Sequence, residues 1–363
     1  MSDMHQLWNM AWRLLLYFIP AFALVAFILA NAMYLQLMER KVLAHMQSRL
    51  GPMRTGWHGV LQPVADAVKF LFKEDIIPAK ADKWVFSIAP LMLLVMAFGS
   101  MVMIPFGPPT DLFGLLTKKV PMWVANLNVG ILFILAFAGI GTYGVIMGGW
   151  ASNNKYSLMG GFRSAAQMIS YEIPMAFAII TVVLLAGSLN LTEIVNAQQG
   201  RWFLFTPVGP VAFFLYLLSG IAETNRVPFD LPEAESELVA GYFTEYSGIR
   251  FGIFYMAEYM NMMVVSLLVS IMFLGGWLPV QIFPHALGGI APVVWLNRAL
   301  AAIPPTLWLL AKLYFFIFFY MWLRATLPRY RYDQLMAISW KVLLPLSLGT
   351  MLVAAFLKQI GWV

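Results

Sequence analysis

Carboxylates are concentrated in one short stretch of this sequence. Residues 223–237, ETNRVPFDLPEAESE, hold five of the 17 acidic residues of the chain, beside a single cation, Arg226. The five are Glu223, Asp230, Glu233, Glu235 and Glu237. If the chain is helical from residue 233 onward, Glu233 and Glu237 share a face, and their like charges disfavour joint ionisation. In a cavity of low dielectric such carboxylates titrate as a coupled set, which is what a proton relay needs.

Part of this stretch also has a structural explanation. The residues DLPE, from Asp230 to Glu233, fit a capping box at the start of a helix, with Pro232 in the first turn. A cap explains Asp230 and Glu233, but it leaves Glu235 and Glu237 unexplained. We therefore favour a functional role for the cluster over a simple solvated surface.

Three acids are placed within or at the end of apolar segments. They are Glu172 in SYEIPMAF, Glu223, and Glu258 in FYMAEYMNMM. A carboxylate at such depth costs a few kcal/mol unless it faces protein or water, so these residues are candidates for function. The structural alternative is an ion pair, for which Lys312 and Lys341 are the cations available within apolar segments.

Two further clusters mix cations with other polar groups. The first, MERKVLAHMQSRLGP from Met38, places Glu39 beside Arg40 and Lys41 directly after an apolar run. Its two cations suit an ordinary anchor at the membrane surface, but Glu39 is less expected there. The second, RATLPRYRYDQLM from Arg324, is either an anchor or, because Tyr and Arg alternate, a contact with a neighbouring soluble protein.

The elements that must position these groups are membrane helices. Hydrophobic residues make up 61% of the 363 residues, charged residues only 11%, and the mean hydropathy is +0.78. A soluble domain needs more polar surface than this. We predict an all-α, polytopic membrane protein forming one helical domain over residues 1–363. The eight expected spans are about 14–38, 84–106, 127–149, 164–187, 205–222, 251–278, 303–323 and 337–357.

The positive charges predict the orientation of these spans. With the N-terminus outside, the inner segments 39–83, 150–163, 223–250 and 324–336 carry 15 Lys and Arg residues, and the outer segments carry six. Both termini are therefore expected on the outer, periplasmic side of a bacterial inner membrane. The net charge of +6 then reflects topology rather than binding of nucleic acid. The inner segments 39–83 and 223–250 form the expected functional face.

The first inner segment contains an amphipathic helix. In VLQPVADAVKFLFK, from Val60 to Lys73, apolar and polar residues form separate stripes at helical spacing. At roughly 20 Å the segment is too short to span the bilayer, so it is expected at the interface. It is either a connector at the membrane surface or the wall of a path for an amphiphilic ligand arriving from the lipid.

Several kinds of chemistry are excluded. The chain has no cysteine, hence no disulfide and no cysteine-ligated Fe–S or zinc site. Its four histidines lie outside the long apolar runs, which argues against a bis-histidine haem between spans. No GxGxxG, P-loop, HExxH or nucleophile-elbow motif occurs in a suitable context. If the protein takes part in redox chemistry, the electrons come from a cofactor in another subunit.

These same stretches resemble a known family. ERKVLAHMQSRLGP, GVLQPVADAVKF, ETNRVPFDLPEAESELVAGY, MAEYMNM and PRYRYDQLM together look like the H-type membrane-arm subunit of bacterial proton-translocating NADH:quinone oxidoreductase, respiratory complex I. The resemblance runs from about residue 38 to 345, and the length and eight-span layout agree with it.

The resemblance implies a role in quinone reduction coupled to proton movement. The implied quinone-binding residues are Glu39, Arg40, Asp66, Lys69, Arg226 and Phe229. The implied proton-relay residues are Glu172, Glu223, Asp230, Glu233, Glu235, Glu237 and Glu258. Quinone is the implied substrate, with ubiquinone favoured over menaquinone, although the sequence does not distinguish them. No metal or cofactor is expected in this chain, since NADH, FMN and the Fe–S clusters belong to partner subunits of that family. The expected partners are peripheral quinone-site and Fe–S subunits, small membrane subunits and lipids.

Three other functions are compatible with parts of the sequence. Anchor subunits of membrane-bound hydrogenases share this fold, but the first inner segment favours the quinone enzyme. A secondary transporter could use the acids as an ion site, although no internal repeat supports it. A passive structural anchor predicts that neutralising Glu172 or Glu258 stabilises the protein without functional loss.

Overall fold

The structure is all-helical, as predicted. The computed structural model describes residues 2–110, 121–231, 239–280 and 297–361, and the regular elements in those ranges are helices. The longer ones are α1 (Ser2–Met46), α2 (Gln62–Phe72), α3 (Lys83–Val102), α4 (Gly130–Ala151), α5 (Lys155–Ala186), α7 (Gly209–Glu223), α9 (Gly248–Phe273), α11 (Pro305–Thr326) and α13 (Leu344–Gln359). The short ones are η1 (Trp57–Gly59), α6 (Leu191–Ala197), η2 (Phe203–Phe205), η3 (Gly241–Phe243), α12 (Tyr332–Ile338) and the π-helical turn η4 (Ser339–Leu343).

Seven helices in the described ranges are long and apolar enough to cross a membrane. They correspond to seven of the eight predicted spans, and the last comprises α12, η4 and α13 as one continuous helix, Tyr332–Gln359. The eighth, predicted at 205–222, is the apolar helix α7, whose 15 residues reach about 22 Å. That is shorter than the hydrocarbon core of a bilayer, so α7 cannot cross the bilayer by itself. Its position depends on packing against neighbouring helices. The chain is a polytopic helical membrane protein.

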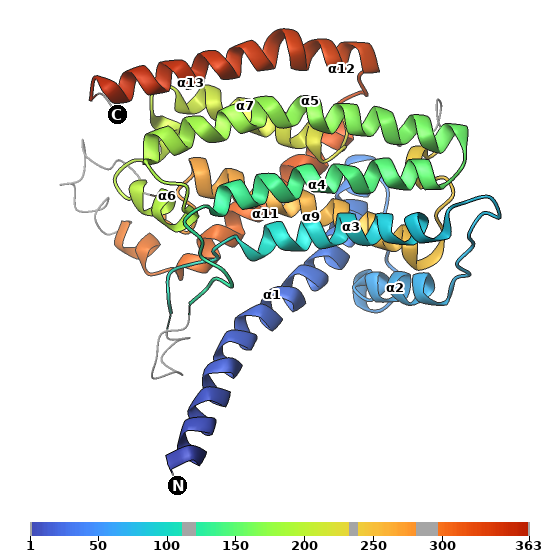
Figure 1. Ribbon diagram of the computed structural model, residues 1–363, viewed down its shortest axis with the longest axis horizontal. Coiled ribbons are helices and arrows are strands. Elements are labelled where there is room, and N and C mark those ends of the chain that lie inside the picture. The colour runs from blue at the N-terminus through green and yellow to red at the C-terminus, as the bar shows by residue number, and fades with distance from the viewer. Residues whose placement is uncertain (1, 111–120, 232–238, 281–296, 362–363) are drawn as a thin grey trace.

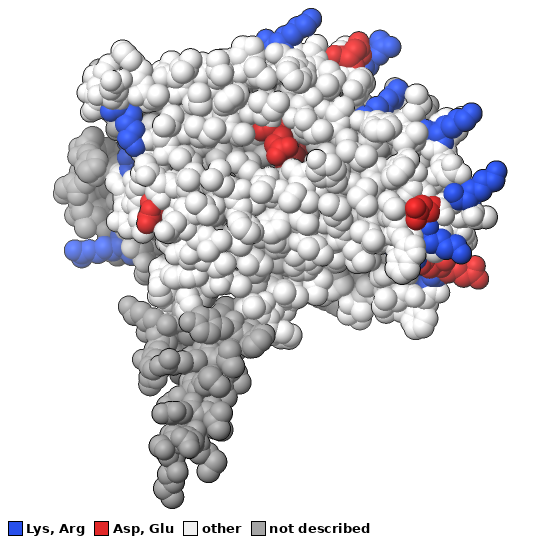
Figure 2. All heavy atoms as spheres, in the orientation of Figure 1, with Lys and Arg blue, Asp and Glu red and all other residues white. Residues whose placement is uncertain are grey.

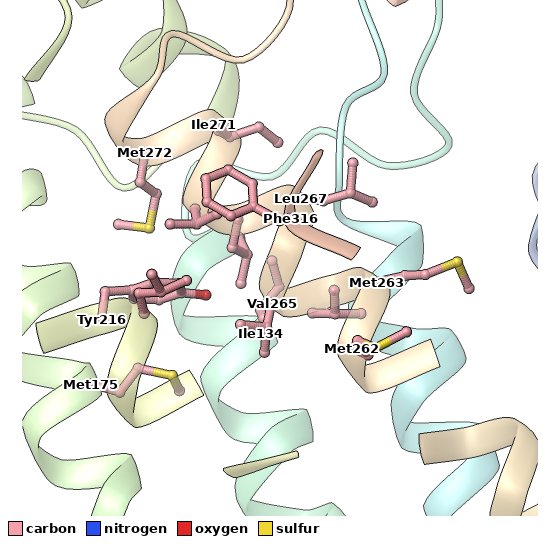
Figure 3. Packing of buried hydrophobic residues seen from close by; sticks show 14 of the residues in the cluster. Ile134, Met175, Tyr216, Met262, Met263, Val265, Leu267, Ile271, Met272 and Phe316 are labelled. Carbon is pink, nitrogen blue, oxygen red and sulfur yellow. The ribbon is translucent and has the colours of Figure 1, made fainter. Parts of the chain in front are cut away.

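Helix α9 is the centre of the bundle. Of its most apolar window, 83% is buried within the chain, against 17% for the last helix, Tyr332–Gln359. Figure 3 shows side chains from α4, α5, α7 and α11, including Met175, Tyr216 and Phe316, packed around the buried face of α9. A residue on α9 therefore lies among several other helices. A polar side chain there is away from water and needs hydrogen-bond or ion-pair partners from those helices.

The long helices alternate in direction. In Figure 1 the segments that follow α1, α4, α7 and α11 all lie at the right-hand end of the bundle, together with α2. Figure 2 shows most of the Lys and Arg side chains on that same end, and beside it a broad belt that is white except for an acidic side chain near its middle. This arrangement agrees with the predicted grouping of the inner segments.

Helix α1 is longer than the predicted span 14–38. It continues to Met46, because no glycine or proline follows the end of the predicted span until Gly51 and Pro52. Glu39 and Arg40 thus lie on the last turns of this helix, not in a loop after it. The helix places them on different sides: Glu39 is buried, and Arg40 is exposed.

The predicted inner loop at 150–163 is also mostly helix. Helix α5 begins at Lys155, because the side chain of Asn154 accepts a hydrogen bond of 2.9 Å from the backbone N–H of Tyr156 and caps it. The loop therefore shrinks to residues 152–154. The early start of α5 allows Gly160 to pack directly on η3, where a Cβ on Gly160 would lie 2.5 Å from the Cα of Gly241.

The predicted amphipathic helix is present as α2. Its apolar stripe is exposed in the isolated chain: Leu61, Val64, Val68, Leu71 and Phe72. Its opposite side, with the buried Pro63 and the partly buried Asp66, faces α1 and α9. The helix thus presents apolar side chains outward and a carboxylate inward, which suits a position at the lipid interface.

Candidate functional site

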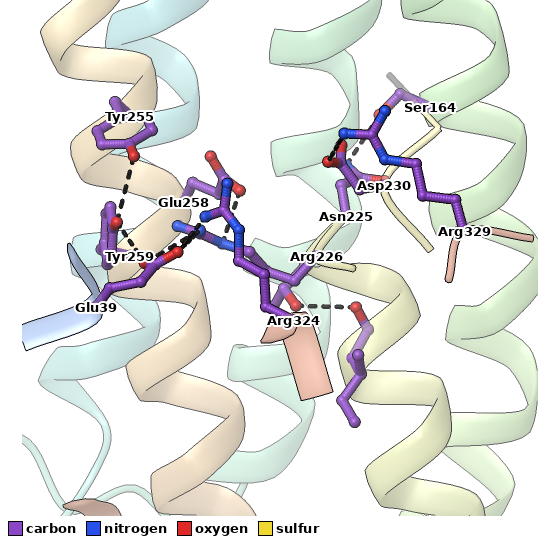
Figure 4. A network of polar contacts seen from close by, with 12 residues as sticks. Glu39, Ser164, Asn225, Arg226, Asp230, Tyr255, Glu258, Tyr259, Arg324 and Arg329 are labelled. Carbon is purple, nitrogen blue, oxygen red and sulfur yellow. Dashed lines mark hydrogen bonds and ion pairs between the residues drawn. The ribbon is translucent and has the colours of Figure 1, made fainter. Parts of the chain in front are cut away.

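Four charged side chains from four parts of the chain meet inside the bundle. Glu39 comes from α1, Arg226 from the segment after α7, Glu258 from α9, and Arg324 from the last turn of α11. Figure 4 shows Arg226 and Arg324 converging on Glu39, with Glu258 beside Arg226. We call these four residues the charge cluster. Two carboxylates and two guanidinium groups balance, so the cluster carries no net charge.

Arg226 connects both carboxylates. Its Nε lies 2.9 Å from Oε1 of Glu258, and its Nη1 lies 3.4 Å from both carboxylate oxygens of Glu39. Only 7% of Arg226 is exposed. Burial by itself disfavours the charged guanidinium, but the carboxylates of Glu258 and Glu39 hold the pKa of Arg226 well above its usual range. Arg226 therefore stays positively charged over the physiological pH range.

Two tyrosines of α9 extend the charge cluster. The hydroxyl of Tyr259 donates a 2.6 Å hydrogen bond to Oε2 of Glu39, whose Oε1 also pairs with Arg324. The hydroxyls of Tyr255 and Tyr259 lie 3.3 Å apart. The guanidinium carbon of Arg226 lies 4.4 Å from the ring centre of Tyr259, a cation–π distance. Glu39 thus accepts from a tyrosine and pairs with two arginines.

A second polar group links α2 to α1. Arg40 pairs with Asp66 at 2.8 Å, and Gln62 donates to the other oxygen of Asp66 at 3.0 Å. Thr55 in turn donates to Gln62 at 2.7 Å. These bonds fix α2 beside the end of α1, with the carboxylate of Asp66 on the inward side.

A cavity of ≈ 320 Å³ lies between α1, α2 and α9. Its lining is largely apolar and includes Met33, Phe70 and Met256. Four polar side chains also line it: Gln36, Asp66, Tyr255 and Tyr259. Pockets for small ligands are commonly about 300–1,000 Å³, mostly apolar, with a few placed polar groups. This cavity has that character, and Tyr259 joins it directly to the charge cluster.

One of the predicted acids, Glu223, lies at a second place in the bundle interior. Glu223, at the end of α7, and Asn261 of α9 line a small cavity of ≈ 40 Å³, which has room for about one water molecule. Glu172 of α5 is close enough for its charge to act on Glu223. Glycine at position 139 of α4 gives Glu172 its space, because a Cβ there would lie 3.1 Å from Oε1 of Glu172. Glu172 and Glu223 thus act on each other through their charges, and neither belongs to the described ion pairs of the charge cluster.

The segment between α7 and residue 231 is held by side chains from other helices. Gln167 of α5 donates 2.7 Å hydrogen bonds to the carbonyls of Ala222 and Phe229. Arg329 pairs with the buried Asp230 at 3.0 Å. The ring of Tyr330 stacks on Phe229 at 5.6 Å. These contacts position the backbone that carries Arg226.

Not every predicted site residue lies at this site. Phe229 is buried against Tyr330 and Tyr171 and does not line the cavity, and Lys69 is exposed on α2. Asp230 pairs with Arg329, as described above. Glu233, Glu235 and Glu237, and with them the predicted capping box, lie outside the described residues.

The prediction that Lys312 pairs with one of the acids in the apolar segments is wrong. Its ammonium group donates to the backbone carbonyls of Leu274, Gly276 and Leu278 instead. Lys341 is exposed on the last helix. Within the described residues, Glu258 and Glu39 pair with arginines, because the segment after α7 and the last turn of α11 both reach the bundle interior.

Sequence reasoning misses Gln36 of the cavity, Arg324 of the charge cluster and the two tyrosines beside it. The sequence predicts Arg324 as an anchor or a partner contact, although it reaches Glu39 of its own chain. Tyr255 and Tyr259 lie one turn apart on either side of Glu258, and that spacing is the available signal. Among the described residues, no group of three or more His, Cys, Asp or Glu side chains is placed to hold a metal ion.

The fold and the site define a class of protein: a polytopic helical membrane protein with an amphiphile-sized cavity beside a buried, charge-balanced cluster. The profile of the NADH dehydrogenase family matches residues 19–355, and the chain belongs to that family. It is 48% identical over 346 residues to the second H subunit of the NADH-quinone oxidoreductase of Geobacter metallireducens, covering 92% of this chain and 93% of the relative. It is also 48% identical to the H subunit of the NADH-quinone oxidoreductase of Thermomicrobium roseum over 346 residues, covering 93% and 94%.

Proposed function

We propose that this chain is the membrane subunit of an NADH:quinone oxidoreductase that forms the lipid-side part of the quinone chamber. The cavity between α1, α2 and α9 takes the quinone, and the charge cluster responds to its reduction. Relatives that match more than nine-tenths of the chain carry the name of this enzyme. NADH, FMN and the Fe–S clusters belong to partner subunits in this proposal, and both termini face the periplasm of a bacterial inner membrane.

One observation carries the proposal. The largely apolar cavity shares a wall residue, Tyr259, with the buried charge cluster, through the 2.6 Å bond to Glu39. Reduction of a quinone by two electrons creates negative charge and draws two protons. In a site of low dielectric, such a change acts strongly on charges a few ångströms away. A ligand in this cavity is therefore coupled electrostatically to Glu39, Arg226 and Glu258.

The acidic residues supply the route for the proton response. In the proposal, Glu258 passes the electrostatic change toward Glu223 and Glu172, and the stretch 230–237 completes the route. Its carboxylates are Asp230, Glu233, Glu235 and Glu237. The role of each residue follows from charge and position, since buried carboxylates near one another take up and release protons as a set.

Filling the cavity tests the quinone site. Gly252 lines the cavity on α9, and a Cβ added there would meet Phe70 at an ordinary 3.6 Å, so Gly252→Leu projects its side chain into the space. In the assembled complex we expect this variant to lower NADH:quinone turnover at least about tenfold, the effect of losing roughly 1.4 kcal/mol of binding. NADH oxidation with a water-soluble acceptor such as ferricyanide is expected to stay unchanged.

A matched glycine supplies the control for this experiment. Gly349 lies on α13, where a Cβ would have nothing within 4 Å, so Gly349→Leu adds the same side chain away from the cavity. It is expected to leave quinone turnover unchanged. Equal quinone turnover in Gly252→Leu and Gly349→Leu complexes would show that the quinone does not bind in this cavity.

Neutralising Glu258 tests the coupling. Glu258→Gln keeps the size of the side chain but removes one of the two anions that balance Arg226. We expect quinone turnover and quinone-driven proton uptake by membrane vesicles both to fall at least about tenfold, because proton transfer by a placed group contributes about 10²–10⁴-fold. Glu193→Gln, on the far end of the bundle at α6, serves as the control. Normal proton pumping in the Glu258→Gln complex would contradict a role for this carboxylate.

A further inference from the structure

The hydroxyl of Tyr259 has a fixed direction. Glu39 is paired with two guanidinium groups, so it is a carboxylate, and a carboxylate only accepts hydrogen bonds. In the 2.6 Å contact between them, Tyr259 must therefore be the donor. A phenol has a single proton to donate, and this one is committed to Glu39.

The direction of the next hydroxyl follows from the first. Tyr255 and Tyr259 share a hydrogen bond of 3.3 Å, in which the proton of Tyr259 is no longer available. Tyr255 is then the donor, and its own proton points toward Tyr259. The two tyrosines form a chain in which both protons are directed toward Glu39, as Figure 4 allows the reader to follow. What Tyr255 has left for a ligand is the lone pairs of its oxygen, which accept.

Other polar groups of the cavity have the same bias. Asp66, which lines the cavity, is a carboxylate held by Arg40 and Gln62, and it likewise only accepts. Tyr259 has already donated its proton. Of the four polar side chains that line the cavity, only Gln36 has N–H groups with which it could donate. The polar wall of this cavity is therefore built mainly from hydrogen-bond acceptors.

We propose that the Tyr255–Tyr259–Glu39 chain makes this cavity selective for the reduced head group, the quinol, over the quinone. This inference rests on the proposed function. A quinol carries two hydroxyl donors, and one of them completes a continuous chain through Tyr255 and Tyr259 to Glu39. A quinone carries only carbonyl acceptors at those positions. To bind a quinone oxygen, Tyr255 must turn its proton into the cavity and give up its bond to Tyr259, which leaves no net hydrogen bond gained.

Tyr255 is thus a specificity-determining residue that favours binding of the product, the quinol. Sites built to pair with a ligand O–H group reject the analogue that lacks it, because their own polar groups are then left unpaired. The selectivity keeps the reduced head group beside the charge cluster. There the hydrogen-bonded chain connects the protonated head group to Glu39. It also predicts that quinol is an effective product inhibitor of this enzyme.

Removing one hydroxyl tests the inference. In the assembled complex in lipid nanodiscs, Tyr255→Phe keeps the ring but removes the acceptor. We expect the inhibition constant of a short-chain quinol, measured against the matching quinone, to rise about tenfold, as for loss of one buried hydrogen bond. The KM for the quinone is expected to change less than about twofold. Tyr314→Phe removes a hydroxyl that bonds Asn31, away from the cavity lining, and is expected to change neither constant.

The outcomes separate this inference from the function on which it rests. A rise in the quinol inhibition constant alone supports the selectivity. An equal change in both constants, or no change in either, overturns it. If Gly252→Leu still lowers quinone turnover in that case, the cavity remains the quinone site and only its preference for quinol is lost. If Gly252→Leu has no effect either, the proposed function fails together with the selectivity.

Discussion

Exchange of Arg226 for methionine is expected to destabilise the folded chain by about 3–5 kcal/mol, the usual cost of leaving a buried charge without its partner. Arg226 is the only cation that contacts both Glu258 and Glu39 in the described ion pairs. Without it, the two carboxylates are left with Arg324 alone to balance their charge. The expected result is a lower unfolding temperature of the purified complex and a fall in quinone turnover to the limit of detection.

Two comparisons separate charge from packing in this prediction. The double variant Arg226→Met with Glu258→Met leaves the neutral pair Glu39 and Arg324, and it is expected to be more stable than Arg226→Met alone. Replacing a complete buried pair by apolar residues is often neutral or even stabilising. Arg40→Met breaks the pair with Asp66, but Arg40 has a side chain 45% exposed, so the expected loss is below about 1 kcal/mol. A double variant less stable than the single one would mean that shape, not charge, determines the stability of the cluster.

The fold was predictable because membrane helices obey simple constraints. In lipid every backbone group must be hydrogen-bonded within the chain, so long apolar runs become helices wherever they occur. The spans found here follow the apolar runs, and Lys and Arg gather at one end of the bundle in Figure 2. Helix ends were less predictable. Helix α1 continues past the apolar run through Glu39 and Arg40, because charged side chains end a hydrophobic run without ending a helix.

The acidic residues of the candidate site were predictable from the sequence, but the residues with which they form ion pairs were not. A carboxylate such as Glu258 stands out in an apolar segment, since its burial is costly wherever it points. Its partner Arg226 is 32 positions away, and Arg324 is 285 positions from Glu39. No local pattern encodes such distances, because they depend on how the helices pack. Tyr255 and Tyr259 resemble ordinary aromatic residues of a membrane helix until Glu39 is placed beside them.

Exchange of Lys312 for methionine is the second change with a large expected effect. Lys312 is 8% exposed, and its ammonium group donates all three of its protons, to the carbonyls of Leu274, Gly276 and Leu278 at 2.7, 2.7 and 2.9 Å. These carbonyls follow the C-terminal end of α9, where a cation also interacts favourably with the negative end of the helix dipole. Methionine fills similar space but leaves three buried or partly buried acceptors without this donor. After the desolvation of the ammonium is allowed for, we expect a loss on the order of 3 kcal/mol.

The matched control for this prediction is the other lysine of the apolar segments. Lys341 is exposed on the last helix, so Lys341→Met is expected to change the free energy of unfolding by less than about 0.5 kcal/mol. Both variants are compared by thermal unfolding of the purified complex, with quinone turnover measured below the transition. Because Lys312 holds the end of α9 opposite the charge cluster, a properly folded Lys312→Met complex is expected to keep its KM for quinone. If both variants unfold at the temperature of the parent complex, the three carbonyls do not depend on Lys312, and water replaces its ammonium at no cost.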